Sequence, residues 1–134
     1  MSRLNWFEYG MQLAKTASLR SEDPYIQVGC CILRPDNSVA SLGYNGAPPG
    51  VDIDWSDRDE RRKRVIHAET NALRFIRPGE GDRMFVTLMP CSECLKNAVS
   101  YGIKKIFYEK TYDFDTSSKE LAAEFKVTLQ QINP

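Results

Sequence analysis

The sequence predicts an α/β protein in which a mixed β-sheet carries helices on both faces. Segments of helical and strand-like pattern follow one another in the order helix, hairpin, helix, strand, helix, strand, helix, strand, which is typical of a sheet covered by helices. Residues 84–89 form a nearly continuous apolar run, MFVTLM, as expected of a strand buried on both faces. The chain has 134 residues and no internal repeat, so we expect one domain over residues 1–134.

The N-terminal segment predicts an amphipathic helix over residues 4–18. Its apolar stripe recurs at helical spacing and consists of Leu4, Phe7, Met11, Ala14 and Ala17. Trp6, Tyr9 and Leu13 lie off that stripe. They predict either a wide core face or a contact between subunits, and the sequence favours neither alternative.

A β-hairpin follows the first helix. Residues 26–33 alternate between two faces as a strand does, so the adjacent Cys30 and Cys31 point to opposite sides of the sheet. Residues 34–38 (RPDNS) have the composition of a turn. Residues 39–44 therefore return as the antiparallel partner strand.

The middle of the chain predicts two helices on either side of the apolar strand. Residues 51–63 are highly charged, and a helix is expected from about residue 64 to residue 74. The next helix covers residues 91–101 and stops at Gly102, because glycine is favoured directly after a helix.

The C-terminal part predicts a strand, a helix and a last short strand. The strands cover residues 103–108 and 127–132. Between them, Ser117 and Glu120 match a capping box that opens a helix ending near Phe125.

Charge and cysteine content narrow the class of protein. The chain has 18 basic and 18 acidic residues, so no overall field attracts it to nucleic acid or to a membrane. It shows no apolar run of membrane-spanning length and no signal peptide at its N-terminus. Four cysteines without a secretory signal favour metal chemistry in a reducing compartment, and we expect a cytoplasmic protein.

Zinc-binding residue types stand at the starts of two predicted helices. His67 lies early in one helix, and Cys91 and Cys94 stand at the start of the next. Helices that start on the same side of a sheet bring these side chains together, and imidazole and thiolate are the ligands that zinc prefers. Three ligands leave the fourth position for water. Glu69 stands two residues beyond His67 and is expected to face that water without binding the metal.

Two other interpretations of these residues remain open. A strand followed by C-x-x-C at a helix start also resembles a thioredoxin-like redox site. A structural zinc site needs a fourth ligand, but His67 is the only histidine, and at most one of Cys30 and Cys31 can face the site. The set of available ligands therefore favours three ligands and an open position.

Two loops contain candidate ligand-binding residues. Arg20 lies in the polar loop 19–24 and is a candidate phosphate clamp, although a solvated surface arginine is the simpler interpretation. The loop 43–50 (GYNGAPPG) is rigid and sharply turned, and its Asn45 offers a donor and an acceptor. Acidic residues are interleaved with a basic cluster that precedes His67, so we expect a solvated lead-in or a charged insertion there. The cluster consists of Arg58, Arg61, Arg62, Lys63 and Arg64.

The motifs resemble those of the cytidine/deoxycytidylate deaminase superfamily, and within it those of deoxycytidylate (dCMP) deaminases. The segments HAETNA at 67–72 and PCSEC at 90–94 match the H-x-E…P-C-x-x-C signature of zinc nucleobase deaminases. The segments RSEDP at 20–24, VG at 28–29 and GYNGAPPG at 43–50 are similar to stretches typical of dCMP deaminases. The similarity extends over roughly residues 13–112.

The resemblance implies a three-layer αβα sandwich with a five-stranded sheet and one catalytic Zn²⁺ ion per subunit. It also implies hydrolysis of dCMP to dUMP and ammonia, with zinc on His67, Cys91 and Cys94 and with Glu69 as the proton shuttle. The substrate-binding residues that it implies are Arg20 and Ser21 near the phosphate, Asn45 at the sugar, and Ala68, Pro90 and Tyr112.

The resemblance further implies a homo-oligomer, with a hexamer favoured. Many dCMP deaminases are hexamers that are activated by dCTP and inhibited by dTTP. The effector site would lie near Tyr44, Asn45 and Gly46, and Mg²⁺ would accompany a nucleoside triphosphate. Pro49 and Val51 depart from the residues common in relatives, which leaves this control open. Deaminases acting on cytidine, guanine or tRNA adenosine are the rivals. The basic cluster at 61–64 keeps the tRNA enzymes open as an alternative, whereas the zero net charge and the 43–50 loop count against them.

Overall fold

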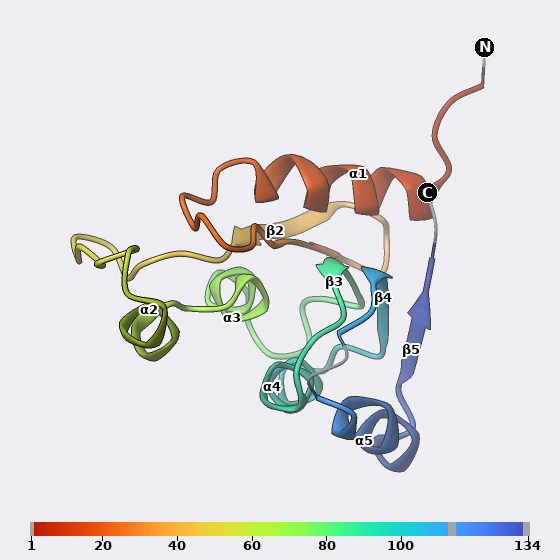
Figure 1. Ribbon diagram of the computed structural model, residues 1–134. Helices are drawn as coiled ribbons and strands as arrows, with labels where there is room; N and C mark the ends of the chain where they lie inside the picture. The colour runs from red at the N-terminus through yellow and green to blue at the C-terminus, as the bar shows by residue number, and fades with distance from the viewer. Residues whose placement is uncertain (1, 113–114, 133–134) are drawn as a thin grey trace.

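The computed structural model describes residues 2–112 and 115–132 and contains one five-stranded mixed sheet with helices on both faces (Figure 1). The strands are β1 (Gly29–Leu33), β2 (Val39–Tyr44), β3 (Arg83–Leu88), β4 (Lys105–Lys110) and β5 (Thr128–Gln131). The helices are α1 (Trp6–Ser18), α2 (Arg58–Arg64), α3 (Ala68–Leu73), α4 (Ser92–Ser100) and α5 (Ser117–Phe125). The order predicted from the sequence is confirmed, apart from one additional helix.

The sheet has the strand order β2-β1-β3-β4-β5. Its first three strands are antiparallel, with Cys30 of β1 opposite both Gly43 of β2 and Val86 of β3. β3, β4 and β5 run parallel to one another. Because β3 and β4 are parallel, α4 carries the chain back to the edge of the sheet where β3 begins. α4 itself starts at the opposite edge, where β3 ends.

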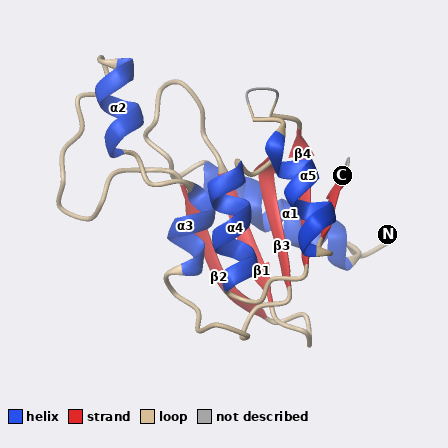
Figure 2. Cartoon of the chain, turned by 90° about the horizontal axis from the view of Figure 1, so that it is seen from below, coloured by secondary structure: helices blue, strands red, loops and turns tan. Residues whose placement is uncertain are grey.

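Three layers result, and the two faces of the sheet have separate cores. α1 covers one face, whereas α3, α4 and α5 cover the other (Figures 1 and 2). Cys31 and Phe85 pack beneath α1, and Cys30 and Val86 pack beneath α3 and α4. The prediction that the adjacent cysteines point to opposite faces is therefore confirmed.

The first helix starts two residues later than predicted, because Asn5 caps it. The Asn5 side chain accepts a hydrogen bond from the Glu8 backbone at 2.8 Å, and the Glu8 carboxylate accepts one from the Asn5 backbone at 3.0 Å, which is a capping box. Met11 and Ala14 are fully buried, but Trp6 and Phe7 stay about half exposed. The core face of α1 is thus narrower at its N-terminal end than the pattern predicts.

The predicted helix 64–74 is wrong at its start. α2 ends at Arg64 and α3 begins at Ala68, and between them Ile66 forms an isolated antiparallel bridge with Gly46. Two backbone hydrogen bonds of 2.9 and 3.1 Å join Ile66 and Gly46. The bridge holds the chain extended, so His67 becomes the residue that precedes α3.

The capping box expected at Ser117 is also wrong, although the helix bounds 117–125 are confirmed. Thr116 precedes α5 and makes no side-chain cap hydrogen bond. Asp115 instead accepts hydrogen bonds from the backbone of Ser117 at 3.0 Å and of Ser92 at 2.8 Å. One carboxylate therefore stabilises the starts of both α4 and α5. Across the described part of the chain, none of the helices combines the length and apolar character that crossing a membrane requires.

Candidate active site

The predicted zinc ligands meet at the starts of two helices. His67 immediately precedes α3 and Cys91 immediately precedes α4, while Cys94 lies in the first turn of α4. The ligand atoms of the three residues all lie within 4.8 Å of one another. The Nδ1 atom of His67 is 3.2 Å from the sulfur of Cys94 and 3.7 Å from that of Cys91.

Local backbone geometry explains this convergence. His67 and Cys91 both have extended backbones, with ψ values of 154° and 168°, so each side chain leaves its helix at the N-terminal end. β3 delivers the chain to Pro90, which is buried and whose missing N–H suits a helix start. The prediction of two helix starts on one side of the central strand is therefore confirmed.

The donor set and its protonation fit a zinc ion. The pKa of Cys91 is lowered to about 4 because its thiolate accepts hydrogen bonds from Cys94 and His67. The pKa of Cys94 is raised by its hydrogen bond to Cys91 and by burial, so one proton is held between the two sulfurs. A cation replaces such a proton, because metal ligation requires thiolates. One nitrogen and two sulfurs also leave the open position that catalytic zinc sites keep.

Glu69 lies in the first turn of α3 and is 4% exposed. Burial raises the pKa of its carboxyl group, while the nearby His67 acts in the opposite direction. A buried carboxyl group whose pKa is raised binds a proton more readily than an exposed one, which suits a group that takes up and releases protons beside a metal site.

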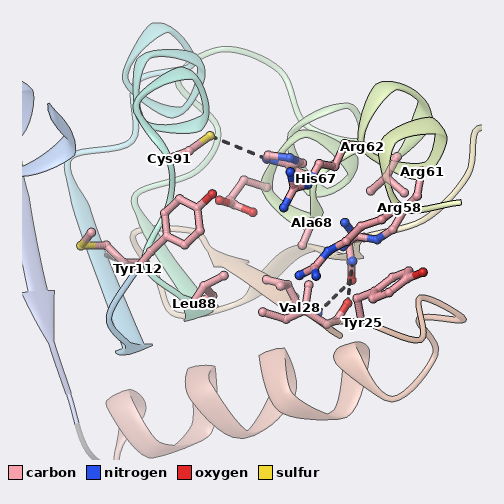
Figure 3. A pocket seen from close by; sticks show the side chains of 15 residues that line it. Tyr25, Val28, Arg58, Arg61, Arg62, His67, Ala68, Leu88, Cys91 and Tyr112 are labelled. Atoms are coloured by element: carbon pink, nitrogen blue, oxygen red, sulfur yellow. Dashed lines mark hydrogen bonds between the residues drawn. The ribbon is translucent and has the colours of Figure 1, made fainter. Parts of the chain in front are cut away.

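A cavity of about 540 Å³ opens in front of these residues, within the range of small-molecule sites. Figure 3 shows Cys91 and Tyr112 at the left, Arg58 and Arg61 at the right, and His67 between them beside Arg62. The residues that line it are Tyr25, Ile26, Val28, Asn45, Arg58, Arg61, Arg62, Val65, His67, Ala68, Glu69, Leu88, Met89, Cys91 and Tyr112.

Three of the six predicted substrate-binding residues line the cavity, namely Asn45, Ala68 and Tyr112. The Asn45 side chain is held by the protein itself. Its oxygen accepts from the Val28 backbone at 2.8 Å, and its nitrogen donates to Asp23 at 3.1 Å and to the Ile26 carbonyl at 2.9 Å. Asn45 thus fixes the wall formed by residues 26–28.

The other three predicted substrate-binding residues do not line the cavity. Arg20 is exposed. Ser21 is buried and donates to the Asn45 carbonyl at 2.8 Å. The Pro90 carbonyl accepts a hydrogen bond from the Ser118 hydroxyl at 2.8 Å.

The predicted effector residues lie at the end of β2 and just beyond it. Tyr44 is exposed, and its carbonyl accepts from the Asn71 side chain at 2.8 Å. Gly46 forms the bridge to Ile66. Of this group only Asn45 reaches the cavity.

The arginines of α2 are the lining residues that the sequence analysis missed. Arg58, Arg61 and Arg62 all line the cavity, whereas a solvated lead-in was expected. The solvated interpretation holds for Lys63 and Arg64, which are exposed and pair with Glu60. A signal was present in the sequence, because residues 58, 61, 62 and 65 fall on one helical face.

A buried ion pair docks α2 onto the body of the protein. Two guanidinium nitrogens of Arg61 lie 2.6 and 2.7 Å from one oxygen of Asp23. Asp23 is 1% exposed and also accepts from the backbones of Tyr25 and Ile26 at 2.8 and 3.3 Å. The Tyr25 ring packs against the guanidinium groups of both Arg58 and Arg61, each 5.2 Å from the ring centroid.

Comparison with known proteins identifies the family. Residues 4–110 match the family model for the cytidine and deoxycytidylate deaminase zinc-binding region. Human deoxycytidylate deaminase is 36% identical over 127 residues, which covers 86% of this chain and 71% of the human protein. A Caenorhabditis elegans relative is 38% identical over 122 residues, and the match spans 62% of that protein's length.

The fold agrees with this match. The crystal structure of dCMP deaminase from the cyanophage S-TIM5, in complex with dCMP and dUMP, aligns with a TM-score of 0.81. The alignment covers 98% of this chain and all of the phage chain, at 24% identity. The three-layer fold predicted from the resemblance is therefore confirmed, and the chain belongs to the cytidine and deoxycytidylate deaminase family.

Proposed function

We propose that this protein is a zinc-dependent hydrolase that converts dCMP to dUMP and ammonia, which supplies dUMP for thymidylate synthesis. The observation that carries the proposal is the buried Glu69 carboxyl group beside the cluster of His67, Cys91 and Cys94, at the wall of a substrate-sized cavity. The relatives named as deoxycytidylate deaminases, the human protein among them, support the choice of substrate.

Zinc held by His67, Cys91 and Cys94 supplies Lewis acidity, which lowers the pKa of water toward neutrality. Glu69 accepts a proton from the attacking water, and the water oxygen bonds to C4 of the cytosine. Glu69 delivers that proton to N3. It then transfers the second proton of the water to the exocyclic amine, the C4–N bond breaks, and ammonia leaves with the bonding electrons.

The cavity walls suit a pyrimidine nucleotide. Val28, Leu88 and Met89 give the cavity apolar wall, which suits a flat base. Arg58 and Arg62 line the same cavity and make part of its wall basic. This combination favours a substrate with one aromatic base and one anionic group.

The test of this function is ammonia release from dCMP, CMP and cytidine by the purified protein and by two variants. Glu69→Gln is expected to retain one zinc per chain and to lose about 10²- to 10⁴-fold in kcat, as expected when a general acid–base is removed. Cys94→Ser is expected to lose both zinc and activity. Undiminished turnover by Glu69→Gln, or wild-type protein that holds zinc and acts on none of the three compounds, would refute the proposal.

Binding of tRNA would indicate a different function with the same deamination chemistry, namely that of a tRNA deaminase. A protein that neutralises several phosphates loses affinity steeply as salt rises, whereas a mononucleotide enzyme shows a shallow dependence. Measurement of KM between 50 and 200 mM salt, about the range over which the effect is large, separates the two.

Several expectations from the sequence remain predictions. They are a single catalytic domain over residues 1–134, a hexamer, activation by dCTP and inhibition by dTTP near Tyr44, Asn45 and Gly46, and Mg²⁺ bound with the effector. The cytoplasmic location also remains a prediction.

A further inference from the structure

We propose that Arg58 and Arg62 of α2 bind the 5′-phosphate of the nucleotide and that Arg61 positions them. The inference rests on the proposed function for the identity of the nucleotide. It assigns the phosphate to a helix that the sequence resemblance does not implicate, because the resemblance points to Arg20 and Ser21, which do not line the cavity.

One face of α2 meets the cavity. Arg58 and Arg62 are four residues apart and Arg61 lies between them on the same helical face. All three line the cavity (Figure 3). Lys63 and Arg64 point away and pair with Glu60. The basic residues of α2 are therefore divided between a solvent face, where a carboxylate neutralises them, and a cavity face.

The cavity face of α2 carries positive charge that the described residues do not neutralise. Asp23 neutralises Arg61 through contacts of 2.6 and 2.7 Å. Within the described residues, neither Arg58 nor Arg62 has a carboxylate within ion-pair distance. Two unneutralised guanidinium groups thus face a cavity whose carboxylate, Glu69, lies beside the zinc ligands. A phosphate monoester carries a charge of about −1.5 to −2 at pH 7, which complements two arginines.

The Arg58 and Arg61 side chains are held in fixed positions, and such fixed positions let a phosphate site select its ligand. The guanidinium of Arg58 stacks on the Tyr25 ring at 5.2 Å, and the same ring packs against Arg61. The Tyr25 hydroxyl donates to the Ser56 carbonyl at 3.4 Å and so contacts the loop before α2. Arg61 is anchored to the buried Asp23. Because planar guanidinium groups held in place bind phosphate with two parallel hydrogen bonds, such an arrangement is specific for a phosphorylated ligand.

The experiment compares dCMP with 2′-deoxycytidine, which differ only in the phosphate. For wild-type protein we expect a much higher kcat/KM for dCMP. Arg58→Gln and Arg62→Gln are each expected to reduce the ratio of the two kcat/KM values by about 10- to 100-fold, the effect of a hydrogen bond to a charged group, mainly through KM.

Lys63→Gln is the matched control, because it removes the same charge from the same helix but outside the cavity, with its side chain 71% exposed. It should leave the ratio within about two-fold of wild type, as surface charges contribute little. Arg20→Gln tests the competing assignment. A ratio that falls in Arg20→Gln and not in the α2 variants would overturn the inference while leaving the deaminase function intact.

Binding of the product provides a readout that does not depend on turnover. Calorimetric titration with dUMP and with deoxyuridine should show tighter binding of dUMP to wild type, and this preference should disappear in the Arg58→Gln, Arg62→Gln double variant. Equal binding of dUMP by wild type and the double variant would refute the inference. Preference for dUMP without any turnover of dCMP would instead refute the proposed reaction and leave the phosphate site standing.

Discussion

Replacement of Arg61 by methionine tests whether α2 is held by a buried charge pair. The substitution leaves Asp23, whose side chain is fully buried, without its cation, while Arg61 itself is 11% exposed. Removal of one partner of a buried pair destabilises a protein by about 3–5 kcal/mol. We expect a value near 3 kcal/mol here, because local detachment of α2 lets water reach Asp23.

The size of this loss can be measured by urea unfolding and by thermal melting of the zinc-loaded protein. For 134 residues, the entropy of unfolding is about 0.28 kcal/mol/K, so 3 kcal/mol corresponds to a decrease of about 10 °C in Tm. Asp23→Asn combined with Arg61→Met should be more stable than Arg61→Met alone, because the uncompensated charge is gone.

Lys63→Met serves as the control on the same helix and should change the free energy of unfolding by less than about 0.5 kcal/mol. An Arg61→Met protein within about 1 kcal/mol of wild type would refute the reasoning, since it would mean that Asp23 is already hydrated and that α2 is not docked.

Two further predictions concern the close packing of β1 against α1 and the dependence of the protein's stability on pH below neutrality. A Cβ at Gly29 would lie 1.7 Å from the Ala14 carbonyl oxygen, so Gly29→Ala should destabilise the protein by about 3 kcal/mol or more in urea unfolding. Gly46→Ala, whose Cβ would come no closer than 3.9 Å to other atoms, should lose less than about 1 kcal/mol, and equal losses in the two variants would contradict the packing argument. The backbone N–H of Arg77 and the Arg34 side chain hold the pKa of Glu80 below its ordinary value of 4.5. Its ionised form therefore stabilises the protein above pH 4.5, and this contribution is lost as the pH falls further. The difference in the free energy of unfolding between wild type and Glu80→Gln should shrink in urea unfolding series below pH 4.5. A difference that stays constant with pH would contradict the stabilising role of the ionised Glu80 carboxylate.

The clustering of His67, Cys91 and Cys94 could be predicted because the information that places them is local. Short-range pattern reveals the helix start at Cys91, with Cys94 one turn later, and it places His67 near the N-terminal end of the preceding helix. The apolar β3 between them fixes their side of the sheet. Residue type and spacing were sufficient for this part of the site.

The break between α2 and α3 could not be predicted in this way, because a long-range contact causes it. Val65 and Ile66 continue the apolar pattern of a helix, yet Ile66 pairs with Gly46, twenty positions earlier in the chain. The buried role of Arg61 was hidden for the same reason. Its partner, Asp23, is 38 residues upstream, and the acidic residues beside Arg61 in the sequence suggested that it was solvated.

The bridge between Gly46 and Ile66 has a consequence for how substrate choice can change. It closes residues 47–65 into an excursion that leaves the sheet layer and returns to nearly the same point, immediately before His67 (Figure 2). Loop-closure entropy grows only slowly with length, so the excursion can be lengthened or shortened at little cost in stability as long as Asp23 keeps a cationic partner in place of Arg61. Such a change would leave β3, α3 and α4 in place. The reactive centre and the part that meets the far end of the ligand are thus carried by separable pieces of chain, and a graft between the bridge residues would transfer ligand preference without rebuilding the metal site.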